Sequence, residues 1–143
     1  MVSPLASTEA SPDTWEQLIQ IKSIKCLFTD ATRGDWDEGK LTLTPAGTER
    51  LELHFDAINT KLKTARLIGN QGAGDVAVFL TESGLNFVEV TLAGSVNLTT
   101  VFGVYKKHTK EFIAVTSRHL LLSSGNGLWP FPGQIHGSCL AWQ

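Results

Sequence analysis

One segment of the chain places ionisable side chains between apolar ones. Residues 111–121 include Thr116, Ser117, Arg118 and His119 among apolar neighbours. Alternation along a strand sends Arg118 to one face and His119 to the other, so the inward face receives a charged or titratable group either way. Histidine suits acid–base chemistry near neutral pH, and a buried arginine needs a partner because an unpaired buried charge is costly.

Neighbouring segments add polar groups at the same place. In a meander, the segment with Glu89 pairs with the segment with Thr100 and Tyr105, and that one pairs with the segment holding Arg118 and His119. We therefore expect these side chains to orient the polar part of a ligand. Two structural alternatives stay open: a Glu89–Arg118 ion pair, or side chains that simply face solvent.

An aromatic segment interrupted by prolines, Leu128–Gly133, follows in a Ser/Gly/Asn-rich stretch. The prolines favour extended conformations for Trp129 and Phe131. Large apolar side chains on a stiff loop suit a lid over a binding site or a contact for a partner. The alternative is a loop packed down on the fold, with Trp129 closing one end.

The elements that would position these residues are strands. From Ile24 onward the apolar residues alternate, and the breaks between strands carry turn residues such as Gly69–Gly74 and Ala93–Ser95. Most connections are too short for a parallel crossover, so neighbouring strands should be antiparallel. The predicted strands are 24–30, 40–44, 50–56, 64–69, 75–81, 85–92, 96–105, 111–121 and 135–142.

A meander of this kind leaves two unpaired edges unless it closes on itself. We predict an all-β fold, an antiparallel up-and-down β-barrel of about eight or nine strands, with a β-sandwich as the alternative. Residues 1–10 read as a disordered tail, and residues 11–143 as one domain. The domain begins with a short amphipathic helix over 12–22, which covers one mouth or packs on the wall.

The two cysteines, Cys26 and Cys139, fall near the middle of the first and last predicted strands. One possibility is a pair of buried free thiols, which is common for cysteine. The other is a cross-strand pair close enough to oxidise, which requires that the barrel closes through these two strands.

Composition narrows the partners. The 143 residues carry 12 basic and 14 acidic side chains, for a net charge of −2 with neutral histidines. We therefore expect no nucleic-acid partner and no membrane partner, since a net charge this close to zero offers no attraction to anionic membranes. No secretory signal or long apolar stretch is evident, so the expected location is cytoplasmic, with a mature secreted chain whose signal has been removed as the alternative. No cofactor or metal site is predicted, because the spacing of the cysteines and histidines gives no ligand set.

Three motifs carry a resemblance to known proteins. They are the run Thr64–Val76 around Gly69-Asn70, Phe112–His119 with Ser117-Arg118-His119, and the terminal Gly137–Trp142. This pattern resembles a group of small, functionally uncharacterised bacterial proteins, and the strand plan is similar to calycin-type barrels such as the lipocalins. The lipocalin likeness implies binding of small apolar ligands inside the barrel.

The leading functional prediction is a barrel that binds a small apolar or amphipathic molecule in its interior. The candidate ligand-binding residues are Glu89, Thr100, Tyr105, Arg118, His119, Trp129 and Phe131. A second hypothesis is a barrel enzyme of the isomerase or cyclase type with Glu89 or His119 as acid or base. A third is an interaction module in which Trp129–Gly133 meets a partner or a second copy, giving a homo-oligomer.

Overall fold

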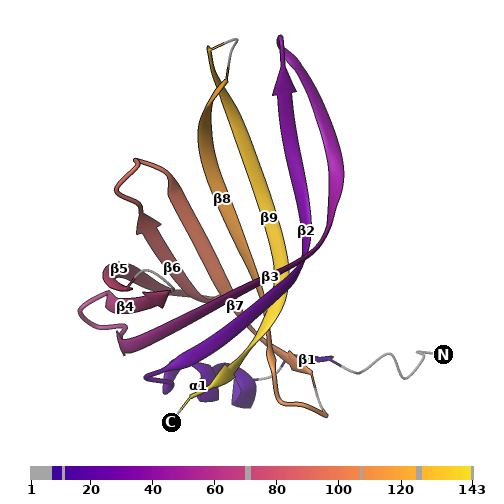
Figure 1. The fold of residues 1–143 in the computed structure, drawn as a ribbon. Helices are drawn as coiled ribbons and strands as arrows, with labels where there is room; N and C mark the ends of the chain where they lie inside the picture. The colour runs from indigo at the N-terminus through magenta and orange to yellow at the C-terminus, as the bar shows by residue number, and fades with distance from the viewer. Residues whose placement is uncertain (1–7, 11, 70–71, 107, 125–126, 143) are drawn as a thin grey trace, which may run out of the picture.

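Ten elements make up the fold in a computed structural model, which describes residues 8–10, 12–69, 72–106, 108–124 and 127–142 (Figure 1). Their order is one short strand, one helix and then eight longer strands. The elements are β1 (Thr8–Ala10), α1 (Pro12–Ile19), β2 (Ile24–Asp37), β3 (Lys40–Asn59), β4 (Thr64–Gly69), β5 (Gly72–Thr81), β6 (Gly84–Val90), β7 (Val96–Lys106), β8 (Phe112–Ser124) and β9 (Gly127–Ala141).

The eight strands β2 to β9 form a closed ring of antiparallel neighbours. Each strand pairs with the next along the chain, and β9 pairs back onto β2, so the first and last long strands meet. This confirms the predicted up-and-down barrel and excludes the sandwich. Closure removes the unpaired edges that a flat meander would leave.

Two features at the N-terminus differ from the prediction. Thr8–Ala10 form β1, which pairs with the last residues of β7, and residues 1–7 of the predicted tail lie outside the described part of the chain. The helix ends at Ile19 rather than at residue 22. It begins with Pro12, which has no N–H to leave unpaired, and lies against β6 and β7 at the lower end of the barrel in Figure 1.

The lower part of the barrel interior is filled by side chains. The rings of Phe55 and Phe87 stack with centroids 3.9 Å apart, and Phe28, Leu85 and Val78 are fully buried with them. These residues alternate with outward-facing ones along each strand, as expected for one dry face. An interior packed in this way holds no large ligand.

Two hairpins extend beyond the rest of the barrel, and here the predicted loops were wrong. Residues 31–37 continue β2, and the turn is Glu38-Gly39, where both residues have positive φ as a two-residue hairpin requires. Pro45–Gly47 lies within β3 rather than at a turn. A register shift opposite Ala31–Thr32, with Gly47 at φ 75°, absorbs the extra residue as a bulge.

The segment Leu128–Gly133 is likewise strand, not loop. It forms the first part of β9 and pairs with β8 through Pro132 and Pro130. Since proline cannot donate a backbone hydrogen bond, both prolines must turn their nitrogens away from β8, toward β2. Pairing of β9 with β2 ends at Arg33 and Gly133 for this reason.

Above that point the β2–β3 and β8–β9 hairpins separate, as Figure 1 shows. We call their extensions the two arms: residues 34–43 on β2–β3, and residues 120–132 on β8–β9, whose turn residues 125–126 lie outside the described part. The shorter β6–β7 hairpin ends lower, so the barrel has an open and uneven upper end.

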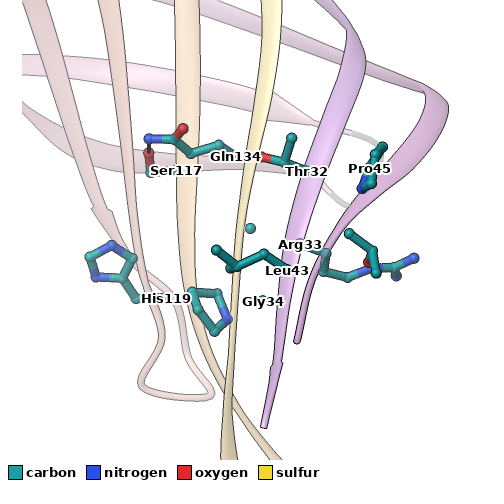
Figure 2. Close-up of a pocket in the computed structure, with 11 residues that line it drawn as sticks. Thr32, Arg33, Gly34, Leu43, Pro45, Ser117, His119 and Gln134 are labelled. Carbon is teal, nitrogen blue, oxygen red and sulfur yellow. Dashed lines mark hydrogen bonds between the residues drawn. The ribbon is translucent and has the colours of Figure 1, made fainter. Parts of the chain in front are cut away.

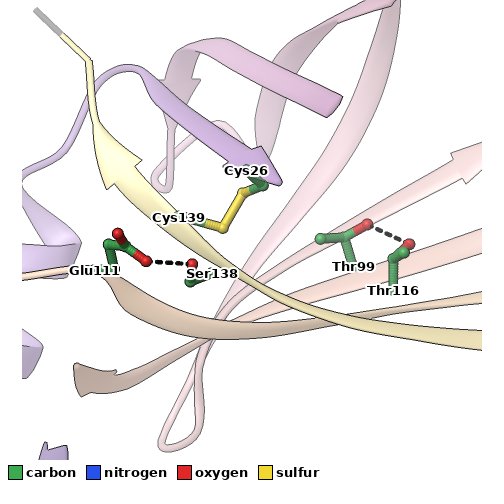
Figure 3. The surroundings of a disulfide bond; sticks show 6 residues. All are labelled: Cys26, Thr99, Glu111, Thr116, Ser138 and Cys139. Carbon is green, nitrogen blue, oxygen red and sulfur yellow. Dashed lines mark hydrogen bonds between the residues drawn. A yellow bond between two sulfur atoms is a disulfide. The ribbon is translucent and has the colours of Figure 1, made fainter. Parts of the chain in front are cut away.

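The β2–β9 junction, or seam, is fixed by a disulfide. Cys26 and Cys139 are register partners, and a bond joins their sulfurs with the Cα atoms 4.0 Å apart (Figure 3). Both residues are buried in the barrel. Of the two possibilities left open by the sequence, the cross-strand pair is the one confirmed.

We predict that removing the disulfide lowers the free energy of unfolding by about 2–5 kcal/mol, because the bond closes a long loop in the unfolded chain. The measurement is urea unfolding of the protein with and without reductant, beside the Cys26→Ala/Cys139→Ala variant. Reductant should destabilise the natural sequence and leave the double variant unchanged. Equal stability with and without reductant for the natural sequence would contradict the prediction.

A glycine allows the seam to close. A Cβ atom at Gly137 would lie 2.0 Å from the Leu27 carbonyl oxygen and 2.6 Å from Phe28 Cα. We predict that Gly137→Ala destabilises the fold by several kcal/mol because backbone, not a flexible side chain, must move. Gly69→Ala is the matched control, since nothing lies within 4 Å of its Cβ. Similar thermal midpoints for the two variants would refute this reading.

Candidate functional site

The candidate site is the upper, open end of the barrel interior, which we call the mouth. Here the ends of β6 and β7 meet the middle of β8, and Glu89, Asn97 and Arg118 fall on neighbouring strands. Asn97 is the register partner of both Glu89 and Arg118, so the three side chains share one face of the sheet. That face is the interior.

Two small adjoining cavities occupy the mouth, and Arg118 lines both. The deeper one has a volume of about 30 Å³, room for a single water-sized group. Its polar lining consists of Glu89, Asn97, Thr99, Thr116 and Arg118. The outer one has a volume of about 140 Å³ and is lined by Ala31, Thr32, Arg33, Glu49, Arg118, Leu120, Phe131, Gly133 and Ile135.

The deeper cavity has one polar wall whose hydrogen bonds are mostly internal. Asn97 Nδ2 donates to Glu89 Oε1 at 2.8 Å, and the buried hydroxyls of Thr99 and Thr116 are 2.8 Å apart (Figure 3). Asn97 Oδ1 is buried with no hydrogen-bond partner. A buried acceptor left in this way costs about 1–3 kcal/mol, which a donor from a bound molecule or water would offset.

Arg118 is the cation of this wall. Its guanidinium has no ion-pair or hydrogen-bond partner among the described residues, although Glu89 and Glu49 line the same cavities. The Glu89–Arg118 ion pair, one of the alternatives left open by the sequence, is therefore not formed. Because Glu89 is engaged by Asn97, Arg118 keeps its hydrogen-bonding capacity for a group placed in the mouth.

Phe131 of β9 forms part of the other wall. Phe131 lines the outer cavity, and the Arg33 guanidinium carbon lies 5.3 Å from the centre of its ring. Trp129 lies two residues further along the same arm, and its indole nitrogen is buried with no acceptor. These side chains are held by a strand, whereas a loop was predicted, either as a lid or partner contact or packed down on the fold.

The structure does not bring the remaining predicted residues to the mouth. His119 is exposed on the outer face, as the register leaves Arg118 inward. Thr100 also lies away from the mouth, with its hydroxyl donating to Asn86 Oδ1 at 2.7 Å. Tyr105 is at the lower end of β7 opposite Phe112, and its side chain lies outside what the structure describes.

Sequence reasoning missed Arg33 and Glu49, because both lie where a loop or turn was predicted. The usable signal was the alternation that continues through residues 31–37 once the chain is read as strand. Thr99, rather than its neighbour Thr100, faces inward, which only the strand register decides.

Two larger grooves lie on the outer surface. One, of about 560 Å³, crosses the base of the two arms and is flanked by Ser117, His119 and Gln134 on one side and Leu43 and Pro45 on the other (Figure 2). Gln134 Nε2 donates to Ser117 Oγ at 3.2 Å. No acidic side chain lines this groove, so His119 has no carboxylate there to orient it.

The second outer groove, of about 490 Å³, surrounds the chain end near Trp142. Lys25 Nζ lies 3.6 Å from the Trp142 ring centre, and His54 packs edge-on against the same ring. Ser23 Oγ and His54 Nε2 are 2.8 Å apart. These contacts tie the C-terminal strand to β2 and β3.

An ion pair between Asp56 and Arg66, which lowers the pKa of Asp56, lies outside the mouth. Arg66 donates two hydrogen bonds to Asp56, at 2.8 and 2.9 Å, and these lower the pKa of Asp56 below its ordinary value. The contribution to stability is present above the unfolded pKa of an aspartate and is lost as the pH falls through the lowered one. This pair joins β3 to β4 and takes no part in the candidate site.

Fold and site together define a closed, all-antiparallel β-barrel with a packed lower interior and a small polar mouth. Comparison of the chain with protein-family models, with curated proteins and with solved structures finds no match. Within the described residues there is no group of three or more potential metal ligands, and no helix is long and apolar enough to cross a membrane.

The Thr99–Thr116 pair allows a test of the polar wall. Thr116→Val leaves the Thr99 hydroxyl buried without a partner, so we expect a loss of about 1–3 kcal/mol in the free energy of unfolding. Thr99→Val/Thr116→Val removes both hydroxyls and should cost clearly less than the sum of the single changes. Strict additivity in urea unfolding would show that the two hydroxyls do not interact.

Proposed function

We propose that this protein binds a small amphipathic molecule at the mouth of the barrel, with the polar end at Arg118. The supporting observation is an inward arginine that lines both mouth cavities and has no partner among the described residues. Arginine offers several donors in a planar fork suited to a carboxylate, sulfonate or phosphate. The class of protein remains the lipocalin-like binding barrel expected from the strand plan.

The apolar end of the ligand would lie toward the arms. Leu120, Phe131 and Ile135 line the outer cavity on that side, and the lower interior is already filled. A ligand of this kind therefore occupies the mouth and projects between the arms, rather than filling the barrel as the sequence analysis expected. This favours a slender molecule with one anionic group.

The disulfide bears on where the protein works. A buried bond between the two strands that close the ring favours an oxidising compartment, since cytosolic thiols are kept reduced. We propose this compartment in place of the cytoplasmic location expected from the sequence.

Catalysis remains the second hypothesis, with a reduced set of residues. His119 faces outward and so cannot act on a molecule in the mouth. Glu89 lines the deeper cavity and is the one candidate acid or base of the two that keeps a suitable position. No observation favours this hypothesis over binding.

The test uses an amphipathic anion, 1-anilinonaphthalene-8-sulfonate, whose fluorescence rises in apolar sites. We expect Arg118→Gln to weaken its binding by about 10–100-fold, since a hydrogen bond to a charged group contributes about 1.5–3 kcal/mol. His119→Gln is the matched control, because it lies one residue away on the opposite face and should bind as the natural sequence does.

Competition by dodecanoate and by 1-dodecanol distinguishes the contribution of the anionic head group to binding from that of the alkyl chain. Dodecanoate should displace the probe at lower concentration than the alcohol, and Arg118→Gln should remove most of that difference. Equal effects of the Arg118 and His119 changes, or no preference for the carboxylate, would overturn the proposal.

A further inference from the structure

Exposed apolar side chains gather at the open end of the barrel. In an up-and-down barrel the β2–β3, β6–β7 and β8–β9 turns all lie at this end. Eight of the large hydrophobic residues that are exposed flank these turns: Leu41, Leu43, Val90, Leu92, Val96, Leu121, Leu122 and Leu128. We call this set the apolar rim.

The β8–β9 arm is apolar on both faces. Leu120, Leu121 and Leu122 are consecutive in β8, so their side chains alternate between the inner and outer faces. Leu128 and Trp129 do the same in β9, opposite Ser123 and Leu122. A strand with one wet face would show polar residues at every second position, so this arm is not patterned for water on either side.

We propose that the apolar rim docks on the surface of a neutral, zwitterionic lipid layer. The two arms separate above Arg33 and Gly133, so the apolar β8–β9 arm projects as a hairpin of its own rather than as part of one flat patch, and a fluid layer can surround it. The described residues 120–124 of the β8–β9 arm extend about 16 Å, at roughly 3.3 Å per residue, which suffices for an interfacial position but not for a crossing.

The charged side chains near the rim favour a zwitterionic lipid over an anionic one. The β2–β3 turn carries Asp35, Asp37 and Glu38 against Lys40, and the β6–β7 turn Thr91–Ser95 carries no charge. The rim therefore has no basic cluster to attract anionic head groups. The earlier expectation of no membrane contact rested on net charge, which does not address uncharged lipid surfaces.

This docking depends on the rim and not on the ligand proposed for the mouth. Both open at the same end of the barrel, so docking would place the mouth at the lipid surface, where amphipathic molecules concentrate.

The experiment is flotation of the full chain, with its disulfide intact, on phosphatidylcholine vesicles. We expect binding together with a blue shift of tryptophan emission. Leu128→Asp and Leu92→Asp should each weaken binding at least tenfold, since these residues are 63% and 111% exposed and their replacement should not disturb the core. Leu62→Asp, 71% exposed at the β3–β4 turn at the opposite end, is the control and should bind like the natural sequence.

Failure of the natural sequence to float would overturn the proposal, as would equal losses for the rim and control variants. Binding only when phosphatidylserine is present would also contradict it. Size-exclusion chromatography of the same proteins tests the competing occupant. Concentration-dependent self-association that Leu128→Asp abolishes would show that a second copy of the chain covers the rim instead.

Discussion

The architecture depends on the seam between β2 and β9. Nine register pairs join these strands, from Ile24 with Ala141 to Arg33 with Gly133, and they convert a linear meander into a ring. The seam requires close approach at Gly137 and is covalently fixed at Cys26 and Cys139. Without it, β2 and β9 would each present a long unpaired edge, which invites association with other chains.

The upper limit of the seam determines where a molecule can bind. Pro132 and Pro130 cannot donate hydrogen bonds to β2, so the ring opens into two arms at that height. Below it, stacked phenylalanines and aliphatic side chains fill the interior; at it, Glu89, Asn97 and Arg118 form a polar wall. The same prolines that end the seam thus create both the mouth and the projecting apolar rim.

The sequence predicts the antiparallel barrel well because alternation and short turns leave few other arrangements. It also singles out Glu89, Arg118 and Phe131, since charged or aromatic groups among apolar strand residues are conspicuous, and the structure brings these three residues to the mouth. It does not identify the arms, because two segments of the arms and their base carry residues typical of turns. Pro45–Gly47 lies at a bulge in β3, and Leu128–Gly133 lies in β9, where most of the segment pairs with β8 alone. Propensity alone cannot distinguish these positions from loops.

Other errors concern strand register, because the register of one strand is set by its pairing with neighbouring strands and not by its own sequence alone. A shift by one residue would exchange Arg118 for His119 and Thr99 for Thr100 at the inner face. Pairing of Asn97 with Arg118 decides the outcome, and that pairing follows from the closure of the whole ring. The cysteines are the exception, since their positions on the first and last strands linked closure to a disulfide in advance.

The central claim is that molecules bind inside the mouth and not in the larger grooves on the outer surface. Nuclear magnetic resonance of the ¹⁵N-labelled protein, titrated with dodecanoate, tests it directly. We predict the largest shifts at the Arg118 Nε–H, the Asn97 side-chain amide and the Thr116 backbone amide, with little change at the Trp142 indole. Shifts centred on Trp142 and Lys25, with Arg118 unaffected, would contradict the account.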